Sequence, residues 1–177
     1  MKTRLVVSVL AALSAVGLLA LILPAWAADT ITTFSLTGGS LTVSAPATKN
    51  LGSAATGSAS ISTTLGNVTV TDARGLLGGS WTASVSSTNF TTGSATANET
   101  INKSNATYLS GTATTSGVAT FTPGQLVAED LSTSRTAYSA AVIVGNNSAT
   151  WNPTVTVNIP AAAVAGTYTG TITHSVA

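Results

Sequence analysis

The stretch of sequence that decides the fold is VTVTDARGLLGGSWTASVS, residues 68–86. Apolar and polar residues alternate over residues 68–71 and again over residues 81–86, whereas residues 72–79 interrupt the alternation with an acidic residue, an arginine and glycines. A period of two is typical of a strand with one buried and one solvent-facing side. The stretch therefore predicts two strands separated by a break.

The same alternation recurs along the rest of the chain, where short runs rich in threonine and valine are separated by glycine, asparagine and proline. Such spacing predicts an all-β fold, a single antiparallel β-sandwich with Greek-key connections of the Ig-like kind. The run at residues 140–144 is apolar throughout, as expected of a strand buried on both faces. Further strands are expected at residues 59–62, 118–121, 151–159 and 167–176.

The clearest local prediction concerns residues 33–43, where alternating apolar residues flank Gly38-Gly39 on both sides. Two glycines between such runs predict a β-hairpin with a two-residue turn. The polar, glycine-containing residues that follow, up to residue 64, are interpreted as a loose connection. They would instead be a linker if the hairpin were a separable unit.

The N-terminus has the pattern of a secretory signal peptide. Lys2 and Arg4 precede an almost uninterrupted apolar run, and Pro24-Ala25-Trp26-Ala27 then offers small residues two positions apart. We expect cleavage after Ala27, so that residues 28–177 form one exported domain. The alternative is an uncleaved membrane anchor, because the run is long enough to cross a bilayer.

Charge and cysteine content limit the classes of partner. Loss of Lys2 and Arg4 changes the formal net charge from +1 to −1, which leaves no basic surface for nucleic acid. The absence of cysteine excludes disulfides, thiolate metal sites and a lipid-modified N-terminal cysteine. Retention on a cell would then require non-covalent binding, and the membrane would be a partner only through an uncleaved signal segment.

Catalytic side chains are scarce. His174 is the single histidine, and alternation places it on one strand face with Tyr168, Ile172 and Val176, which predicts an imidazole packed against the core. Neighbouring acids on a strand point to opposite faces, so the adjacent pair Glu129-Asp130 does not form a paired-carboxylate site. We therefore expect no enzyme activity, no metal site and no cofactor.

Two tryptophans of the exported part, Trp81 and Trp151, each lie at the start of an alternating run. Aromatic side chains contribute most to burial in a core of small residues, which favours a core position for both. An exposed indole would instead be a stacking platform for a sugar ring. Both alternatives remain open at the level of sequence.

Two motifs resemble a known family. VTVTDARG at residues 68–75, followed by GSWTA at residues 79–83, is similar to the first block of WxL-domain proteins of Gram-positive cell surfaces. The second family motif, Y-x4-T-x2-L, matches Tyr168 and Thr173, with Val176 in the leucine position. The chain departs from the family at Ala83, where the family has leucine, and at His174, where it has tryptophan.

The resemblance implies a secreted β-sandwich that is held non-covalently on the cell wall through peptidoglycan, alone or together with other surface proteins. The residues expected near the wall polymer are Trp81, Tyr168, Thr173, His174 and Val176. Residues 65–177 carry the resemblance, and residues 28–64 precede it. A rival hypothesis is a structural subunit whose edge strands pair with other subunits in a surface layer or fibre.

Overall fold

A computed structural model describes residues 27–177. The predicted signal peptide lies outside these residues, apart from Ala27 itself. Residues 36–177 form one compact unit, and residues 27–35, which precede it, are exposed and belong to no strand or helix. Across the described part of the chain, no helix is both long and apolar enough to cross a membrane.

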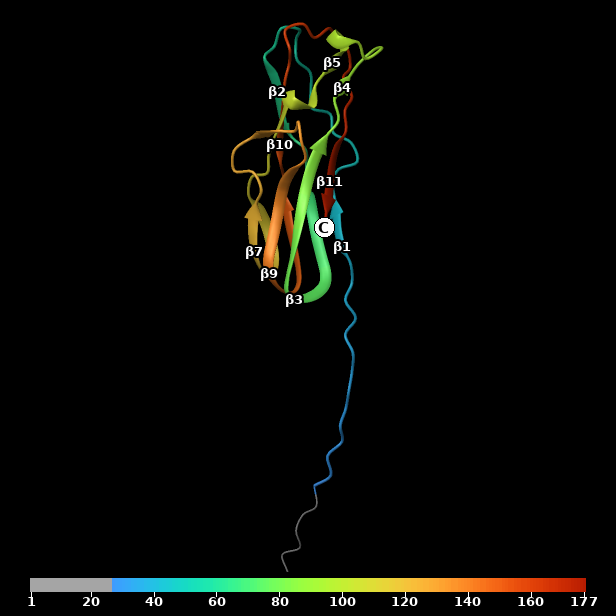
Figure 1. Cartoon of the computed structure of the whole chain (residues 1–177), viewed down its shortest axis with the longest axis vertical. Helices are drawn as coiled ribbons and strands as arrows, with labels where there is room; N and C mark the ends of the chain where they lie inside the picture. Colours follow the sequence, from blue (N-terminus) through green and yellow to red (C-terminus); the bar gives the residue numbers. More distant parts are fainter. Residues whose placement is uncertain (1–26) are drawn as a thin grey trace, which may run out of the picture. The chain divides into compact units, whose positions relative to one another are not determined.

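The described chain is built from strands that pair antiparallel throughout, which confirms the all-β prediction (Figure 1). Two short 3₁₀ helices, η1 (Ala97–Glu99) and η2 (Lys103–Asn105), interrupt the middle of the chain. The strands are β1 (Leu41–Ser44), β2 (Ser60–Thr64), β3 (Val68–Ser87), β4 (Phe90–Thr91), β5 (Thr100–Ile101), β6 (Ala106–Leu109), β7 (Ala113–Pro123), β8 (Glu129–Asp130), β9 (Arg135–Trp151), β10 (Thr154–Asn158) and β11 (Ile172–Val176).

Three sheets result from this pairing. The five-stranded sheet has the order β1-β3-β9-β7, and β11 pairs with β3 on the same side as β1. The four-stranded sheet has the order β2-β10-β6-β8, and β4 and β5 form a two-stranded sheet. The strands predicted near residues 59–62 and 118–121 are confirmed. The strand predicted over residues 151–159 is shorter than expected, because Trp151 ends β9 and β10 begins at Thr154, and the closing strand begins only at Ile172.

The prediction of two strands within residues 68–86 is wrong, because β3 is a single strand that doubles back within its own length, at residues 72–79 (Figure 1). Its partner β9 does the same. Tyr138 and Trp151 both belong to β9 and would lie about 43 Å apart in a straight strand. Their ring centroids are 5.1 Å apart and the rings are stacked, so the two halves of β9 face each other.

Irregular pairing at one level of the sheet produces this bend. The register of β3 against β9 shifts between Asp72 and Leu76 and again between Leu77 and Gly79. β7 shifts at the same level, because Val118 pairs with Val144 and Val144 pairs with Leu77. Bulges increase the local bending of a strand. Because β3, β9 and β7 all have irregular pairing at the same level, the three strands bend together and the sheet folds back on itself.

A buried polar network holds the bend closed. Asp72 is 1% exposed and accepts hydrogen bonds from Nε and the backbone N–H of Arg74, at 2.9 and 3.0 Å. Nδ2 of Asn147 donates to the same carboxylate at 3.2 Å, and the indole N–H of Trp81 donates to Oδ1 of Asn147 at 2.8 Å. The hydrogen bonds from Arg74 hold the pKa of the Asp72 carboxyl below its usual value.

Both tryptophans lie in the core, which confirms the core prediction for them. Trp81 and Trp151 are each 1% exposed, and Trp81 packs against Phe121 at a centroid distance of 6.3 Å. Stacking of a ligand on either indole would require the ring to leave the core. The remaining core consists mainly of small and branched side chains, among them Val68, Val70, Ala83, Val85, Ile143, Ala149, Val155 and Val157.

The hairpin predicted over residues 33–43 does not form. Residues 27–40 belong to no strand, and β1 pairs with β3 instead. The two glycines do not form a turn but let the backbone of residues 38–39 lie close to β3. A Cβ at Gly38 would lie 2.5 Å from the carbonyl oxygen of Arg74. The N–H of Gly39 donates to the carbonyl oxygen of Ala73 at 2.7 Å, which extends the β1 edge by a further pair.

The prediction that residues 140–144 are buried on both faces is also wrong. Ala140 and Ile143 are buried, but Val142 is 67% exposed and Val144 is 47% exposed. Val142 has a φ of 53°, an unusual value for a β-branched residue. The apolar run follows the bend of β9, where alternate side chains cannot all point inward.

We expect the buried carboxylate to be required for a stable bend. Replacing Asp72 with alanine leaves Asn147 and Arg74 without their acceptor, and should lower the free energy of unfolding by about 3 kcal/mol. Urea titration followed by tryptophan fluorescence measures this change. The matched control is Arg135→Ala, which removes an ion pair with the partly exposed Asp130 and should change stability much less than Asp72→Ala does. Equal losses in the two variants would contradict the role of Asp72.

Candidate functional site

Three side chains from three strands form a hydrogen-bonded chain inside the protein. The indole N–H of Trp151 on β9 donates to the hydroxyl oxygen of Tyr108 on β6 at 2.9 Å. The same hydroxyl lies 3.0 Å from Nε2 of His174 on β11. The Tyr108 and His174 rings are tilted with centroids 5.7 Å apart, so these contacts join both larger sheets.

The direction of these hydrogen bonds follows from the donors available. Tyr108 is 0% exposed, and its oxygen already accepts a hydrogen from Trp151. Its own hydrogen therefore needs an acceptor, and Nε2 of His174 is the atom in reach. A neutral imidazole that accepts at Nε2 carries its hydrogen on Nδ1. Nδ1 of His174 is buried and has no hydrogen-bond partner, so it presents an unused donor.

Burial keeps this histidine neutral. It lowers the pKa of His174 to about 4, and it raises the pKa of the Tyr108 hydroxyl well above its usual value. Both groups therefore stay uncharged at neutral pH. The imidazole is a hydrogen-bond donor there and a weak candidate for a general base.

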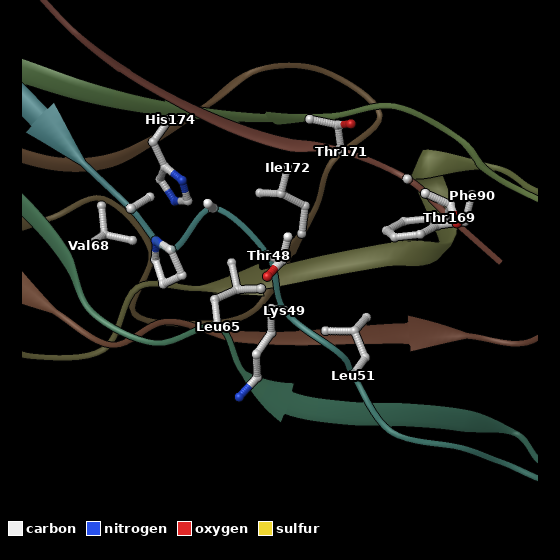
Figure 2. Close-up of a pocket in the computed structure, with 14 residues that line it drawn as sticks. Thr48, Lys49, Leu51, Leu65, Val68, Phe90, Thr169, Thr171, Ile172 and His174 are labelled. Atoms are coloured by element: carbon white, nitrogen blue, oxygen red, sulfur yellow. The ribbon is translucent and has the colours of Figure 1, made fainter. Parts of the chain in front are cut away.

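His174 lines one end of a groove (Figure 2). We define the groove as the space between residues 45–56 on one side and residues 163–174 on the other. Its first part has a volume of about 360 Å³. Figure 2 shows His174 and Ile172 on one side of this part, with Leu65 and Leu51 opposite.

The second part of the groove is larger, with a volume of about 710 Å³. Thr48, Lys49, Phe90 and Thr169 line both parts, so the two adjoin. Apolar side chains of this second part are Leu51, Ile61, Ile101, Val157, Ile159 and Val164.

The wall formed by residues 163–174 is fixed by backbone pairing and close packing. Thr169 exchanges two backbone hydrogen bonds with Thr91, at 2.9 and 3.0 Å. A Cβ at Gly170 would come within 2.6 Å of the Phe90 ring, so only glycine lets the chain lie this close. The hydroxyl of Tyr168 donates toward the carbonyl oxygens of Val164 and Asn98, at 3.0 and 3.1 Å, and fixes the loop before it.

The groove is lined mainly by apolar side chains, together with several hydroxyl groups and the ammonium group of one lysine. The Phe90 ring and branched aliphatic side chains line its apolar surface, and Thr48, Thr169 and Thr171 add hydroxyl groups. Lys49 is the charged residue among the lining side chains of either part. Such a lining suits an elongated ligand with apolar faces and hydrogen-bonding groups.

The structure brings together some of the residues predicted to contact a ligand. Tyr168 and His174 line adjoining parts of the groove. Thr173 belongs to the same strand as His174, but it lies on the exposed face. Trp81 lies in the core, and Val176 is paired with Ala83 on β3, so neither lines the groove.

Sequence reasoning missed one whole side of the groove. Residues 45–56 were interpreted as a loose connection, yet they supply Thr48, Lys49 and Leu51. Tyr108 is not among the predicted site residues, because its contacts with His174 and Trp151 join residues far apart in the sequence. The one available signal was the hydroxyl of a tyrosine in an otherwise polar segment, because a buried tyrosine needs a polar partner.

The adjacent acids Glu129 and Asp130 both form ion pairs with Arg135. The Arg135 guanidinium lies 3.2 Å from the Asp130 carboxylate and 3.8 Å from that of Glu129. Within residues 27–177, no group of three or more His, Cys, Asp or Glu side chains is placed to hold a metal ion.

The depressed pKa of His174 predicts a dependence of stability on pH. The histidine of the unfolded chain has a pKa near 6.5, so it is protonated below that pH. In the folded chain His174 stays neutral down to about pH 4, so protons bind preferentially to the unfolded state between these two values. Stability should therefore be complete above about pH 6.5 and fall as the pH is lowered. Between about pH 7.5 and about pH 5 we expect a loss of about 1 kcal/mol in urea titrations, since partial exposure of the ring weakens the effect.

The control for this prediction is His174→Gln, which keeps a polar side chain but cannot titrate. Its stability should be nearly constant over the same pH range. A loss in the glutamine variant as large as that of the unchanged chain would assign the effect to the carboxylates instead.

Comparisons of the chain with protein-family models, with curated proteins and with solved structures each find no match. The similarity to WxL-domain proteins therefore rests on the two sequence blocks alone.

Proposed function

We propose that this chain is a secreted cell-surface protein that binds the Gram-positive cell wall non-covalently through a WxL-like domain, with the groove as its contact for peptidoglycan. Other surface proteins are further partners in this proposal. The protein acts by binding and not by catalysis, and it uses no cofactor. In this proposal the five-stranded and four-stranded sheets, whose buried side chains form one core, are the two layers of a single β-sandwich.

The observation that carries the proposal is the position of the second motif. The segment that matches Y-x4-T-x2-L begins at Tyr168, and residues 168–172 together with His174 form one wall of the groove. The motif that resembles a wall-binding family thus lies along the groove. The last residue of the first motif adjoins the last residue of the second one, because Ala83 on β3 pairs with Val176 on β11.

The chemistry of the groove agrees with a peptidoglycan ligand. Glycan chains offer apolar ring faces and hydroxyl groups, which match Phe90 and the threonines of the lining. Stem peptides add amide carbonyl and carboxylate oxygens. The ammonium group of Lys49 is a donor for such oxygens.

We expect Lys49→Glu to weaken binding to purified peptidoglycan. The substitution places a negative charge in the groove against the carboxylates of the polymer, and should reduce the apparent affinity about tenfold in a sedimentation assay at low salt. The matched control is Lys103→Glu, which makes the same change of charge on η2, outside the groove.

The two variants separate a groove effect from a general effect of charge. Equal losses for Lys49→Glu and Lys103→Glu would mean that net charge alone governs sedimentation. Failure of the unchanged chain to sediment with peptidoglycan at any salt concentration would refute the proposed function.

A further inference from the structure

The exposed segment before β1 has the pattern of a strand without a partner. Ile31, Phe34 and Leu36 are 92%, 88% and 90% exposed. Phe34 and Leu36 alternate with threonine and serine, which is the pattern of a strand with one apolar face. Large apolar side chains spaced two apart are costly in water and gain most from pairing with a sheet edge.

The longest edge strand of the described chain is β7 (Ala113–Pro123). It pairs with β9 on one side, and no other described strand occupies its second side. Natural edges are usually protected by lysine, by inward-pointing charge or by proline, but β7 contains no charged residue, and its proline is the last residue. The other edges of the two larger sheets, formed by β1, β2, β8 and β11, are at most five residues long.

The apolar side chains of β7 fit the pattern of the exposed segment. Ala119 and Phe121 lie two positions apart, pack against the core and are only partly buried. Phe34 and Leu36 have the same spacing, so an added strand would lay them over these two residues. Thr120 on the opposite, exposed face would then lie beside Ser35.

We propose that residues 30–37 of one copy of this chain add as a strand to the free edge of β7 of a second copy. Main-chain hydrogen bonds to the unpaired edge provide affinity, and Phe34 and Leu36 cover Ala119 and Phe121. The contact joins two different surfaces, so each copy keeps one free segment and one free edge. Such a head-to-tail contact builds open chains of subunits rather than a closed pair.

Chain length favours a second copy over pairing within one chain. The N–H of Gly39 is bonded to Ala73 of β3, at the edge of the sheet opposite to β7. With about 4.8 Å between strands, the chain would need about 19 Å to cross from β1 to the outside of β7. That distance takes about six extended residues, and too few of residues 30–37 would remain to form a strand.

The test compares the exported chain, starting at Ala28, with variants by sedimentation velocity over a range of concentrations. The unchanged chain should form species that grow with concentration. Phe34→Ser combined with Leu36→Ser should weaken association about a hundredfold. The matched control is Leu77→Ser, because Leu77 is 86% exposed at the bend and its loss should leave association unchanged.

Disulfide trapping identifies the contact directly, since the chain has no cysteine of its own. A mixture of Ser35→Cys and Thr120→Cys chains should give a mixed disulfide dimer under mild oxidation. A mixture of Ser35→Cys and Ser60→Cys chains, with the second cysteine on the edge strand β2, should not. These readouts are independent of the groove, so they report on the contact even where peptidoglycan binding fails.

Three results would overturn the proposal. One is an unchanged chain that stays monomeric at its highest soluble concentration. Another is loss of association in Leu77→Ser as large as in the double variant, which would assign the contact to the bend. The third is an intramolecular disulfide, formed in dilute solution by a chain that carries both Ser35→Cys and Thr120→Cys.

Discussion

The carboxylate of Asp72 imposes the constraint on which the rest of the structure depends. A buried charge must be compensated, and here Arg74, two residues ahead, supplies three of the hydrogen bonds that compensate it. One of these bonds comes from the backbone N–H of Arg74 to the Asp72 side chain, a local contact of the Asx-turn type that draws the backbone out of the extended conformation. The bulge in β3 is the consequence. Asn147 then fixes the bend of β9 to that of β3, and Trp81 is held by the same amide.

Once β3 and β9 double back together, the remaining features follow from the topology. β1 and β11 pair with different halves of β3, and the second half of β3 places His174 of β11 within reach of Tyr108. β7 follows β9 through the same bend and ends the sheet. One folded sheet thus supports one wall of a groove through β11 and leaves the long edge of β7 open. Binding and assembly, as proposed, would use separate parts of it.

Much of this fold could be predicted from the sequence, because alternation reports directly which residues face inward. The inward face of His174 follows from a period of two, and the burial of Trp81 and Trp151 agrees with the core position that their size favours. Alternation does not report which strand is the partner, so residues 33–43 looked like a hairpin although β1 pairs with β3. The bend and the groove escaped prediction for the same reason. They depend on Asn147, Tyr108 and residues 45–51, whose contacts are with distant parts of the chain.

The departures from the WxL pattern occur at neighbouring positions in the structure. Val176 and Ala83, both at family leucine positions, are direct partners between β11 and β3. His174 stands at the tryptophan position, and an indole there would offer a donor but no acceptor. Tyr108 needs an acceptor for its buried hydrogen, because its oxygen already receives one from Trp151. Histidine is the aromatic side chain that accepts at one nitrogen and donates at the other. An imidazole at position 174 therefore satisfies Tyr108 through Nε2 and leaves Nδ1–H as a buried donor without a partner among the described residues, whereas an indole there would leave the hydrogen of the Tyr108 hydroxyl without an acceptor.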